Sequence, residues 1–172
     1  MIVFLVGYMG CGKSVIGSKL AEILKYDFID LDDFITEKEG DSIKNIFQLN
    51  GEIYFRKVET LYLKQVLNFD NTVVSLGGGT PCYGNNMDLI LSSTNAMTIY
   101  LKTSISVLAN RLSGETTKRP IISHLVSDTE LKEFIGKHIF ERAPYYEQCG
   151  YIIKTDQLSV DAVVSNLLIE LF

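Results

Sequence analysis

The amino-acid sequence predicts an α/β fold with a parallel sheet. Short apolar runs alternate along the chain with segments whose apolar residues recur at helical spacing, a pattern typical of a parallel sheet covered by helices. A glycine-rich segment at residues 7–14 joins the first apolar run to the first helical pattern. Ligands of such folds bind beyond the carboxyl ends of the strands, and we therefore expect the functional site at that edge.

The first part of the chain, up to residue 69, alternates in this way. Residues 2–6 form a continuous apolar run, as in a strand buried on both faces, and residues 26–30 form a second strand. The helix between them has one apolar face, made of Ile16, Leu20, Ile23 and Leu24. Residues 41–42, Asp-Ser, offer an N-terminal cap for a helix over 43–49. A long helix over 52–69 follows, with its apolar stripe at Val58, Leu61, Tyr62 and Val66.

The rest of the chain continues the alternation. Strands are predicted at 71–76, 96–101 and 151–154, and a helix runs from residue 104 to about residue 112. The next helix carries the stripe Leu131, Phe134, Ile135 and His138, and we expect it to end at Ala143-Pro144, because proline disfavours helical backbone at the preceding residue. The last helix has its stripe at Val160, Val163, Val164, Leu167 and Leu171.

Length and composition are those of a single globular domain. The chain has 172 residues, of which 47% are apolar and 22% charged, which suffices for a core and excludes a disordered chain. Its 16 basic and 21 acidic residues give a formal net charge of −5. Because no basic stripe interrupts this acidic balance, we expect no nucleic-acid partner.

The sequence carries no sign of a membrane segment or of a metal-binding cysteine framework. The first apolar run is far shorter than the ~20 residues that span a bilayer, and no basic region precedes it as in a signal peptide. Cys11, Cys82 and Cys149 form no CxxC pair, and His124 and His138 lie far apart, which excludes zinc-site spacing. We expect a cytoplasmic protein in a reducing compartment, without a membrane partner, and a monomer.

Residues 7–14, GYMGCGKS, fit the phosphate-loop pattern GxxxxGK[ST] after a strand and before a helix, the context that the pattern requires. Glycines let backbone N–H groups surround a phosphate, and the helix N-terminus adds partial positive charge. Lys13 can reach the β- and γ-phosphates of a nucleotide, and the Ser14 hydroxyl can ligate Mg²⁺. Cys11 is interpreted as a small side chain that fits the loop rather than as an activated thiol.

Two carboxylates follow the second predicted strand. In extended chain Asp30 and Asp32 project to the same side, at the carboxyl edge where the γ-phosphate is expected. One carboxylate could then organise Mg²⁺ and its waters while the other contacts an acceptor hydroxyl. The alternative is that Asp32 or Asp33 caps the next helix.

Other candidate residues lie on helix faces and in loops. Arg56 lies opposite the apolar stripe of its helix, facing solvent or a cleft, and Glu59 at i+3 could hold it. Arg142 continues the apolar stripe of its own helix, so it either reaches water near the helix end or binds an anion. His138 on that stripe is interpreted as a core histidine rather than a catalyst. Residues 77–79, three glycines, either form a flexible turn or let a ligand approach the backbone.

The polar segment 113–120 contains a glycine and two threonines and no apolar residue. It fits either an ordinary loop or a mobile lid. Within it, Arg119 is a candidate charge for the phosphates if the loop closes.

Together these pieces resemble shikimate kinase across essentially the whole chain. The matching segments are GYMGCGKS at 7–14, DLD at 30–32, FR at 55–56, GGG at 77–79, KRP at 118–120 and RAPYYE at 142–147. The resemblance implies a three-layer P-loop kinase fold, with a five-stranded parallel sheet of order 2-3-1-4-5 flanked by helices, in one domain over residues 1–172. It further implies a substrate-binding subdomain at about 32–62 and a lid at about 112–126.

The resemblance also implies an activity. ATP, with Mg²⁺, would phosphorylate the 3-hydroxyl of shikimate by in-line transfer, a step of chorismate and aromatic amino acid biosynthesis. Lys13, Asp32 and Arg119 would be the catalytic residues. Asp32 would grip the attacking hydroxyl as the best candidate for a base, and Arg119 would arrive with the lid. Ser14 and Asp30 would hold Mg²⁺.

The same resemblance assigns the binding residues. The nucleotide would contact Gly10, Cys11, Gly12, Lys13, Ser14, Val15, Arg111 and Arg119. Shikimate would contact Asp32, Arg56, Gly78, Gly79 and Arg142. The two arginines would hold its carboxylate in a bidentate geometry that lysine could not reproduce. Cys11 and residues 80–82 are where we expect variation within the family.

Two other functions fit parts of the sequence. Another small-molecule P-loop kinase, such as a gluconate kinase, would keep the phosphate loop and the lid without the set Asp32, Arg56 and Arg142. A nucleotide-binding switch would hold or hydrolyse ATP without an acceptor, and it would give Arg56 and Arg142 no role.

Overall fold

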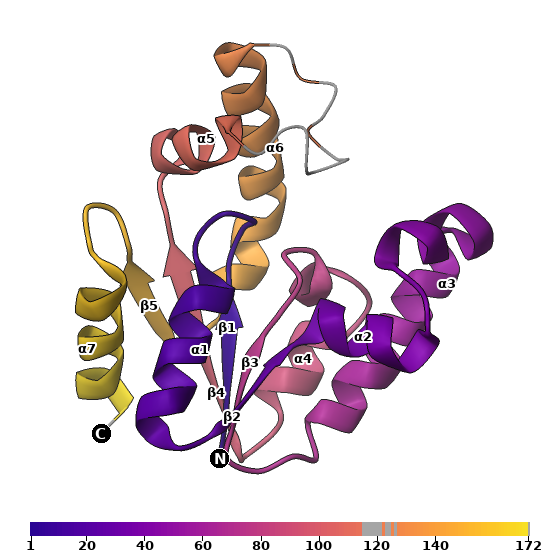
Figure 1. Cartoon of the computed structure of the whole chain (residues 1–172), viewed down its shortest axis with the longest axis vertical. Helices are drawn as coiled ribbons and strands as arrows, with labels where there is room; N and C mark the ends of the chain where they lie inside the picture. Colours follow the sequence, from indigo (N-terminus) through magenta and orange to yellow (C-terminus); the bar gives the residue numbers. More distant parts are fainter. Residues whose placement is uncertain (115–121, 123–124, 126, 172) are drawn as a thin grey trace.

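A parallel sheet forms the centre of the computed structural model, which describes residues 1–114, 122, 125 and 127–171 (Figure 1). Its five strands lie in the order β2-β3-β1-β4-β5. In chain order they are β1 (Ile2–Val6), β2 (Asp27–Asp30), β3 (Thr72–Ser75), β4 (Ala96–Lys102) and β5 (Tyr151–Lys154). The predicted fold class and strand order are therefore confirmed.

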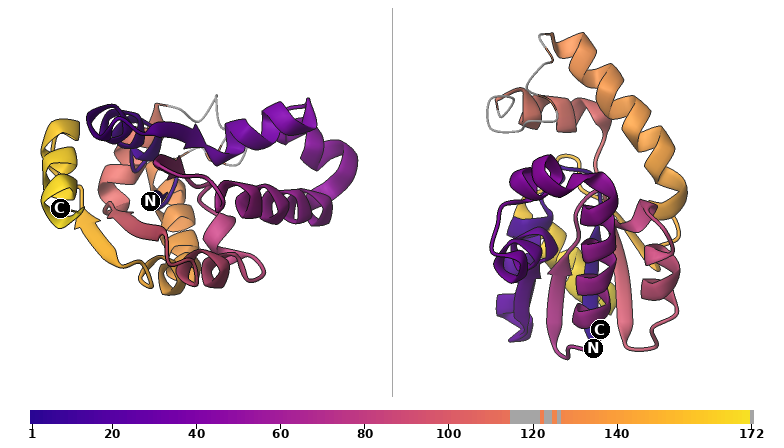
Figure 2. Two further views of the ribbon diagram at one scale, coloured as in Figure 1. Left: turned by 90° about the horizontal axis from the view of Figure 1, so that it is seen from below. Right: turned by 90° about the vertical axis from the view of Figure 1, so that its right-hand side faces the viewer.

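Helices cover both faces of this sheet (Figures 1 and 2). On one face α1 (Lys13–Leu24) packs beside α7 (Val160–Leu171), and on the other α3 (Ile43–Val66) packs with α4 (Asn86–Leu91). Beyond the carboxyl edge, α5 (Ile105–Ser113) packs on α6 (Asp128–Tyr146), and α2 (Leu31–Glu39) packs on α3. A single 3₁₀ turn, η1 (Thr80–Cys82), follows the three glycines after β3.

The central strand β1 divides the core into two halves. All its residues are fully buried, and successive side chains of a strand point to opposite faces. Val3 and Leu5 pack with apolar side chains of α1, α5 and α7. Ile2, Phe4 and Val6 pack instead with those of α2, α3 and α4. The sheet is thus held between two apolar clusters, and the loops at its carboxyl edge are left to carry polar groups.

Helix α3 confirms one sequence prediction and corrects another. Gly51 has φ 81° and ψ 171°, which are not helical, so α3 consists of two helices that meet at a kink, as predicted over 43–49 and 52–69, although the second ends at Val66. Leu61, predicted on the buried stripe, is 51% exposed. That prediction is wrong because the stripe contains a charged residue, Glu59, which an apolar pattern cannot include.

Helix α6 corrects another. It does not end at Ala143 but continues through Pro144 to Tyr146. A proline removes its own backbone hydrogen bond and crowds the carbonyl four residues before it, but the N–H of Glu147 still bonds to the carbonyl of Ala143 at 2.9 Å. Because Pro144 lies in the last turn, the helix loses little by including it.

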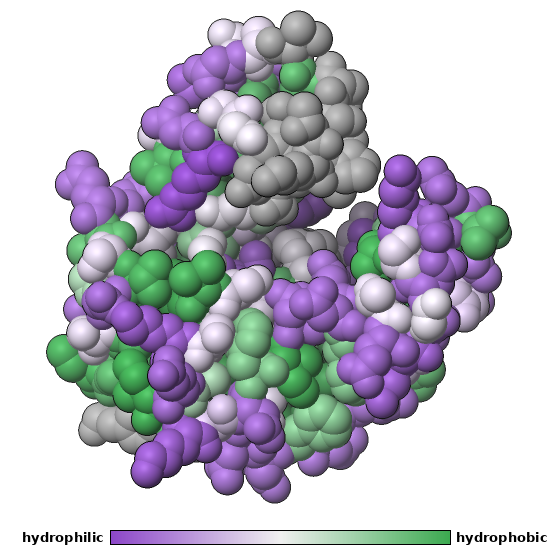
Figure 3. Space-filling model, viewed as in Figure 1, coloured by the Kyte–Doolittle hydropathy of each residue, from purple (hydrophilic) through white to green (hydrophobic). Residues whose placement is uncertain are grey.

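The surface is hollowed between the part formed by α5 and α6 and the arm formed by α2 and α3 (Figure 3). Both parts project beyond the carboxyl edge of the sheet (Figure 1). In the part of the chain that the structure describes, none of the helices has the length and apolar composition to cross a membrane.

Candidate functional site

The phosphate loop lies between β1 and α1 at the carboxyl edge of the sheet. Gly10 and Gly12 have φ of 80° and 101°, in the left-handed region that favours glycine. The ammonium of Lys13 donates to the carbonyl oxygens of Gly7 at 2.9 Å and Tyr8 at 3.1 Å. The loop backbone therefore folds back on the lysine at the N-terminus of α1.

Cys11 is the buried member of this loop. Its side chain is 1% exposed, and a Cβ added to Gly7 would lie 2.7 Å from its sulfur. The side chain therefore fills the space under the loop, which supports the interpretation of Cys11 as a small residue that fits there.

The predicted nucleotide residues outside the loop lie next to it. Val15 is 61% exposed in the first turn of α1. Nη1 of Arg111, at the end of α5, donates to the carbonyl of Gly10 at 3.0 Å. Both residues line a cavity of about 210 Å³ whose other walls include Thr155 and Leu158. This cavity lies at the opposite side of the loop from β3.

Asp30 joins β2 to the phosphate loop. Its Oδ2 accepts a hydrogen bond from the Ser14 hydroxyl at 2.9 Å, and its Oδ1 accepts one from the backbone N–H of Asp32 at 3.1 Å. Asp30 is thus the N-cap of α2. The alternative that Asp32 or Asp33 caps this helix is wrong, and so is the premise that Asp32 lies in extended chain, because α2 begins at Leu31.

Ser14 and Asp30 have the donor chemistry that Mg²⁺ requires. A hydroxyl and a carboxylate are hard oxygen ligands, and Mg²⁺ in phosphate sites is typically held by one or two protein groups, with phosphates and water completing its shell. Among the described residues no three His, Cys, Asp or Glu side chains form a metal-binding group. The hydroxyl of Ser14 and the carboxylate of Asp30, 2.9 Å apart, fit a magnesium ion that shares its remaining ligands with nucleotide phosphates and water.

One cavity of about 410 Å³ connects the phosphate loop to β2 and β3. Its lining includes Lys13, Ser14, Asp30, Asp32 and Gly78. The structure thus brings predicted phosphate and metal residues and two of the predicted shikimate residues, Asp32 and Gly78, to one space at the carboxyl edge. Arg56 lines a neighbouring cavity of about 570 Å³. Arg119, the remaining predicted catalytic residue, and most of the predicted lid lie outside the described residues.

The carboxyl group of Asp32 has an altered acidity. Its pKa is raised to about 6, first by burial and then by the negative charges of Asp30 and Glu59, against the opposing effect of Lys13. A group with this pKa is mostly ionised above about pH 7 and still basic enough to take a proton, which suits a general base.

The three glycines at 77–79 each lie against a different charged side chain. A Cβ on the first would lie 2.9 Å from Oδ1 of Asp32, and one on the second 3.3 Å from Nη1 of Arg142. A Cβ on the third would lie 3.3 Å from both terminal nitrogens of Arg56. None of the three has a positive φ. They are therefore glycines because of the space around them, and not because of their backbone conformation.

Arg56 is held by several partners beside this loop. Its Nη1 donates to Oε2 of Glu59 at 2.9 Å, so the pairing expected from the i+3 spacing is present. Its guanidinium carbon lies 3.5 Å from the centre of the Tyr83 ring, a cation–π contact. The side chain is only 21% exposed. Of the two expected positions, Arg56 occupies the one turned toward a cleft.

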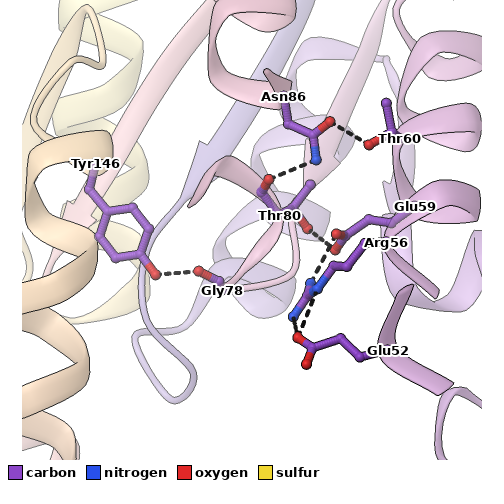
Figure 4. Close-up of polar contacts among 8 residues, drawn as sticks. All are labelled: Glu52, Arg56, Glu59, Thr60, Gly78, Thr80, Asn86 and Tyr146. Atoms are coloured by element: carbon purple, nitrogen blue, oxygen red, sulfur yellow. Dashed lines mark hydrogen bonds and ion pairs between the residues drawn. The ribbon is translucent and has the colours of Figure 1, made fainter. Parts of the chain in front are cut away.

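One face of α6 contacts both loops of the site. His138, Arg142 and Tyr146 follow at intervals of four residues and so share this face. His138 Nδ1 lies 3.0 Å from the Tyr8 hydroxyl, and the Arg142 guanidinium lies 5.4 Å from the centre of the Tyr8 ring. The Tyr146 hydroxyl donates to the carbonyl of Gly78 (Figure 4). Burial, and then the charge of Arg142, lower the pKa of His138, which agrees with a structural histidine.

Sequence reasoning did not single out three tyrosines that contact the site. Tyr8 is part of the phosphate-loop motif and Tyr146 of RAPYYE, but neither motif indicates what the phenol touches. Tyr83 follows η1, and no sequence signal identifies it. All three contacts depend on how α6 and η1 pack, which is a property of the folded chain.

Comparisons with known proteins agree on one family. A family model described as shikimate kinase matches residues 9–172. A shikimate kinase of Flavobacterium johnsoniae is 43% identical over 167 residues, which are 96% of each chain. The crystal structure of shikimate kinase from Bacteroides thetaiotaomicron superposes with a TM-score of 0.92 at 36% identity, over 99% of this chain and 98% of that one. The structure of shikimate kinase from Acinetobacter baumannii in complex with shikimate superposes with a TM-score of 0.86 at 29% identity, over 99% of this chain and 92% of that one.

The raised pKa of Asp32 predicts a stability effect of Asp32→Asn. A carboxyl whose pKa is higher in the folded than in the unfolded chain stabilises the fold below the unfolded pKa, and this stability is lost as the pH rises through about 6. The neutral amide avoids that loss. We expect urea unfolding to show Asp32→Asn about 3 kcal/mol more stable than the parent at about pH 8, with a much smaller difference near pH 4.

The exposed neighbour Asp33 supplies the control, because Asp33→Asn changes the same charge outside the cavity. Equal stability of Asp32→Asn and the parent at the higher pH would contradict the assigned environment of Asp32.

Proposed function

This chain belongs to the shikimate kinase family, and we propose that its described residues divide the reaction into a nucleotide part, a shikimate part and a proton-accepting group. The chain has shikimate kinase activity, a step of the shikimate pathway. The division is supported by the cavity of about 410 Å³ whose lining includes both Lys13 and Asp32. Phosphoryl transfer depends mainly on such positioning and on neutralisation of charge.

The nucleotide part consists of the phosphate loop and its neighbours. The backbone N–H groups of residues 10–15 and the Lys13 ammonium bind the phosphates of ATP, while Arg111 and Val15 flank the rest of the nucleotide in the smaller cavity. Ser14 and Asp30 would hold Mg²⁺ when the nucleotide is bound, and the ion would supply positive charge beside the phosphates. Arg119 is proposed as a further phosphate ligand from its place in the KRP motif.

The shikimate part consists of two arginines and the glycine loop. Arg56 and Arg142 lie against Gly79 and Gly78 respectively, so a carboxylate that meets these glycines also meets the guanidinium groups. Arginine binds carboxylates through two parallel N–H groups. The related enzyme of Acinetobacter baumannii has been solved with shikimate, which supports a shikimate site in this fold. The loop N–H groups add further donors.

Asp32 is the proton-accepting group. It accepts a hydrogen bond from the 3-hydroxyl of shikimate and takes its proton as the oxygen attacks the γ-phosphorus in line, while the bond to the β-phosphate oxygen breaks and ADP leaves. The product is shikimate 3-phosphate. The pKa of Asp32, raised to about 6, leaves it ionised at neutral pH and close to the range in which a base is efficient.

The acceptor is tested by ADP release from Mg·ATP with shikimate, with gluconate and with no acceptor. We expect turnover with shikimate alone, because only a carboxylate-bearing acceptor of the right shape can meet the two arginines and Asp32 together. Turnover with gluconate instead would contradict the roles of the arginines. Equal release in all three reactions would indicate a nucleotide switch.

Separate kinetic effects are expected for the two parts of the site. Arg142→Ala removes a charged partner of the shikimate carboxylate and should raise the KM for shikimate about 10- to 100-fold with little change in the KM for ATP. Lys13→Met should abolish transfer without unfolding the chain. Lys137→Ala, which removes an exposed cation from the same helix, is the matched control. Unchanged kinetics of Arg142→Ala would exclude it from the shikimate site.

The glycine loop predicts a different consequence for each alanine. Gly77→Ala pushes on Asp32 and on the Thr80 hydroxyl, each 2.9 Å from the added Cβ, and because small displacements of a reacting group are costly it should lower kcat about tenfold or more. Gly79→Ala pushes on Arg56 and should mainly raise the KM for shikimate. Gly136→Ala is the control, since its Cβ would meet only Ile105 at an ordinary 3.6 Å. Identical effects of the first two substitutions would contradict this assignment.

A further inference from the structure

A series of polar side chains connects the glycine loop to α3 (Figure 4). Its members come from α3, η1 and α4, and they are Glu52, Arg56, Glu59, Thr60, Thr80 and Asn86. Glu59, Thr80 and Asn86 are at most 1% exposed. Polar groups buried so completely have to bond to one another, because water does not reach them.

Glu59 is at the centre of this series. Its Oε2 accepts from Nη1 of Arg56 at 2.9 Å, and its Oε1 accepts from the Thr80 hydroxyl at 2.6 Å. A buried carboxylate is strongly destabilising unless it is paired and hydrogen-bonded. The two bonds together fix the plane of the carboxylate, and one of them comes from outside α3.

Thr80 is itself fixed by its backbone and by Asn86. Its N–H donates to the carbonyl of Gly77 at 3.0 Å, and its carbonyl accepts from Nδ2 of Asn86 at 2.9 Å. Oδ1 of Asn86 accepts from the Thr60 hydroxyl at 2.7 Å. Because the β-branched side chain of threonine has few rotamers, a fixed backbone also fixes the direction of the Thr80 hydroxyl.

The orientation of Arg56 depends on Glu59 more than on its other partners. Its Nε and Nη2 both donate to Oε1 of Glu52, but each of these bonds is 3.4 Å long and Glu52 is 55% exposed, so they hold the guanidinium less firmly than the 2.9 Å bond to Glu59. The ring of Tyr83 supports the flat face of the guanidinium but leaves rotation within the plane free. The 2.9 Å bond to Glu59 removes this rotation.

We propose that Thr80 is a positioning residue for Arg56. The Thr80 hydroxyl fixes the buried Glu59 carboxylate, and this carboxylate holds the Arg56 guanidinium in the orientation that binds the shikimate carboxylate. This inference rests on the proposed role of Arg56 in binding shikimate. Bidentate binding needs a defined orientation of the guanidinium plane. A carboxylate of Glu59 that is free to turn lets the guanidinium turn with it.

Thr80→Val tests this proposal, because it removes the hydroxyl and keeps the shape of the side chain. We expect the KM for shikimate to rise about five- to tenfold, with kcat and the KM for ATP changed less than about twofold. Thr80→Ser restores the hydroxyl and should return the KM for shikimate to within about twofold of the parent value.

Thr72→Val separates positioning from stability. Thr72 is 1% exposed, and its hydroxyl donates to the carbonyl of Asp70 at 2.8 Å at the amino end of β3, away from the site. Both valine variants lose a buried hydrogen bond and should lower Tm, but only Thr80→Val should raise the KM for shikimate. A lower Tm with an unchanged KM in Thr80→Val overturns the proposal.

Combining Thr80→Val with Arg56→Lys tests whether Thr80 changes the KM for shikimate through Arg56. Lysine keeps the charge beside Glu59 but has no fork to orient, so Thr80→Val should change the KM for shikimate less than about twofold in that background. A full effect there overturns the proposal alone. A normal KM for shikimate in Arg56→Lys overturns the role of Arg56 itself, and with it the role of Thr80.

Discussion

Space around the loop at residues 77–79 limits every other part of the site. Three successive residues lie within van der Waals distance of Asp32, Arg142 and Arg56, which come from three different helices. A side chain at any of these positions would displace one charged group from its place. Close approach of the backbone thus allows one carboxylate and two guanidinium groups from distant parts of the sequence to face one short segment.

Helix α6 connects the glycine loop to the phosphate loop. Residues of α6 spaced by four contact Tyr8 in the phosphate loop and Gly78 in the glycine loop. The helix therefore acts as a rigid spacer between the two loops, since its side chains on one face keep a fixed separation. A structural histidine, an arginine exposed to the site and a buried tyrosine all serve this spacing. The sequence pattern alone places His138 on an apolar stripe that Arg142 continues, and it does not indicate the contact of Tyr146.

The fold and much of the site could be predicted from local patterns. Buried strands are apolar runs, and the phosphate loop is contiguous in sequence, so neither needs knowledge of packing. The position of Asp32 could be predicted only in part. Helix α2 begins at Leu31 because Asp30 is its N-cap, and the bond between Asp30 and Ser14 forms only in the folded chain. The stripe of α3 was misassigned because it includes Glu59, whose burial is possible only with partners from η1. Contacts of Tyr83 depend entirely on packing.

Two carboxylates near the glycine loop have opposite surroundings, and this difference fits the chemistry. Glu59 is bonded on both oxygens by donors, one of them cationic. Asp32 faces the negative charges of Asp30 and Glu59, and its pKa is raised to about 6. The same type of group can thus have two roles in one site: the fully bonded Glu59 suits a structural role, and Asp32, with its raised pKa, suits a reactive one. In the proposed mechanism the fixed Glu59 orients Arg56 and, because its charge raises the pKa of Asp32, also makes Asp32 a better proton acceptor, so one buried anion would support both substrate binding and transfer.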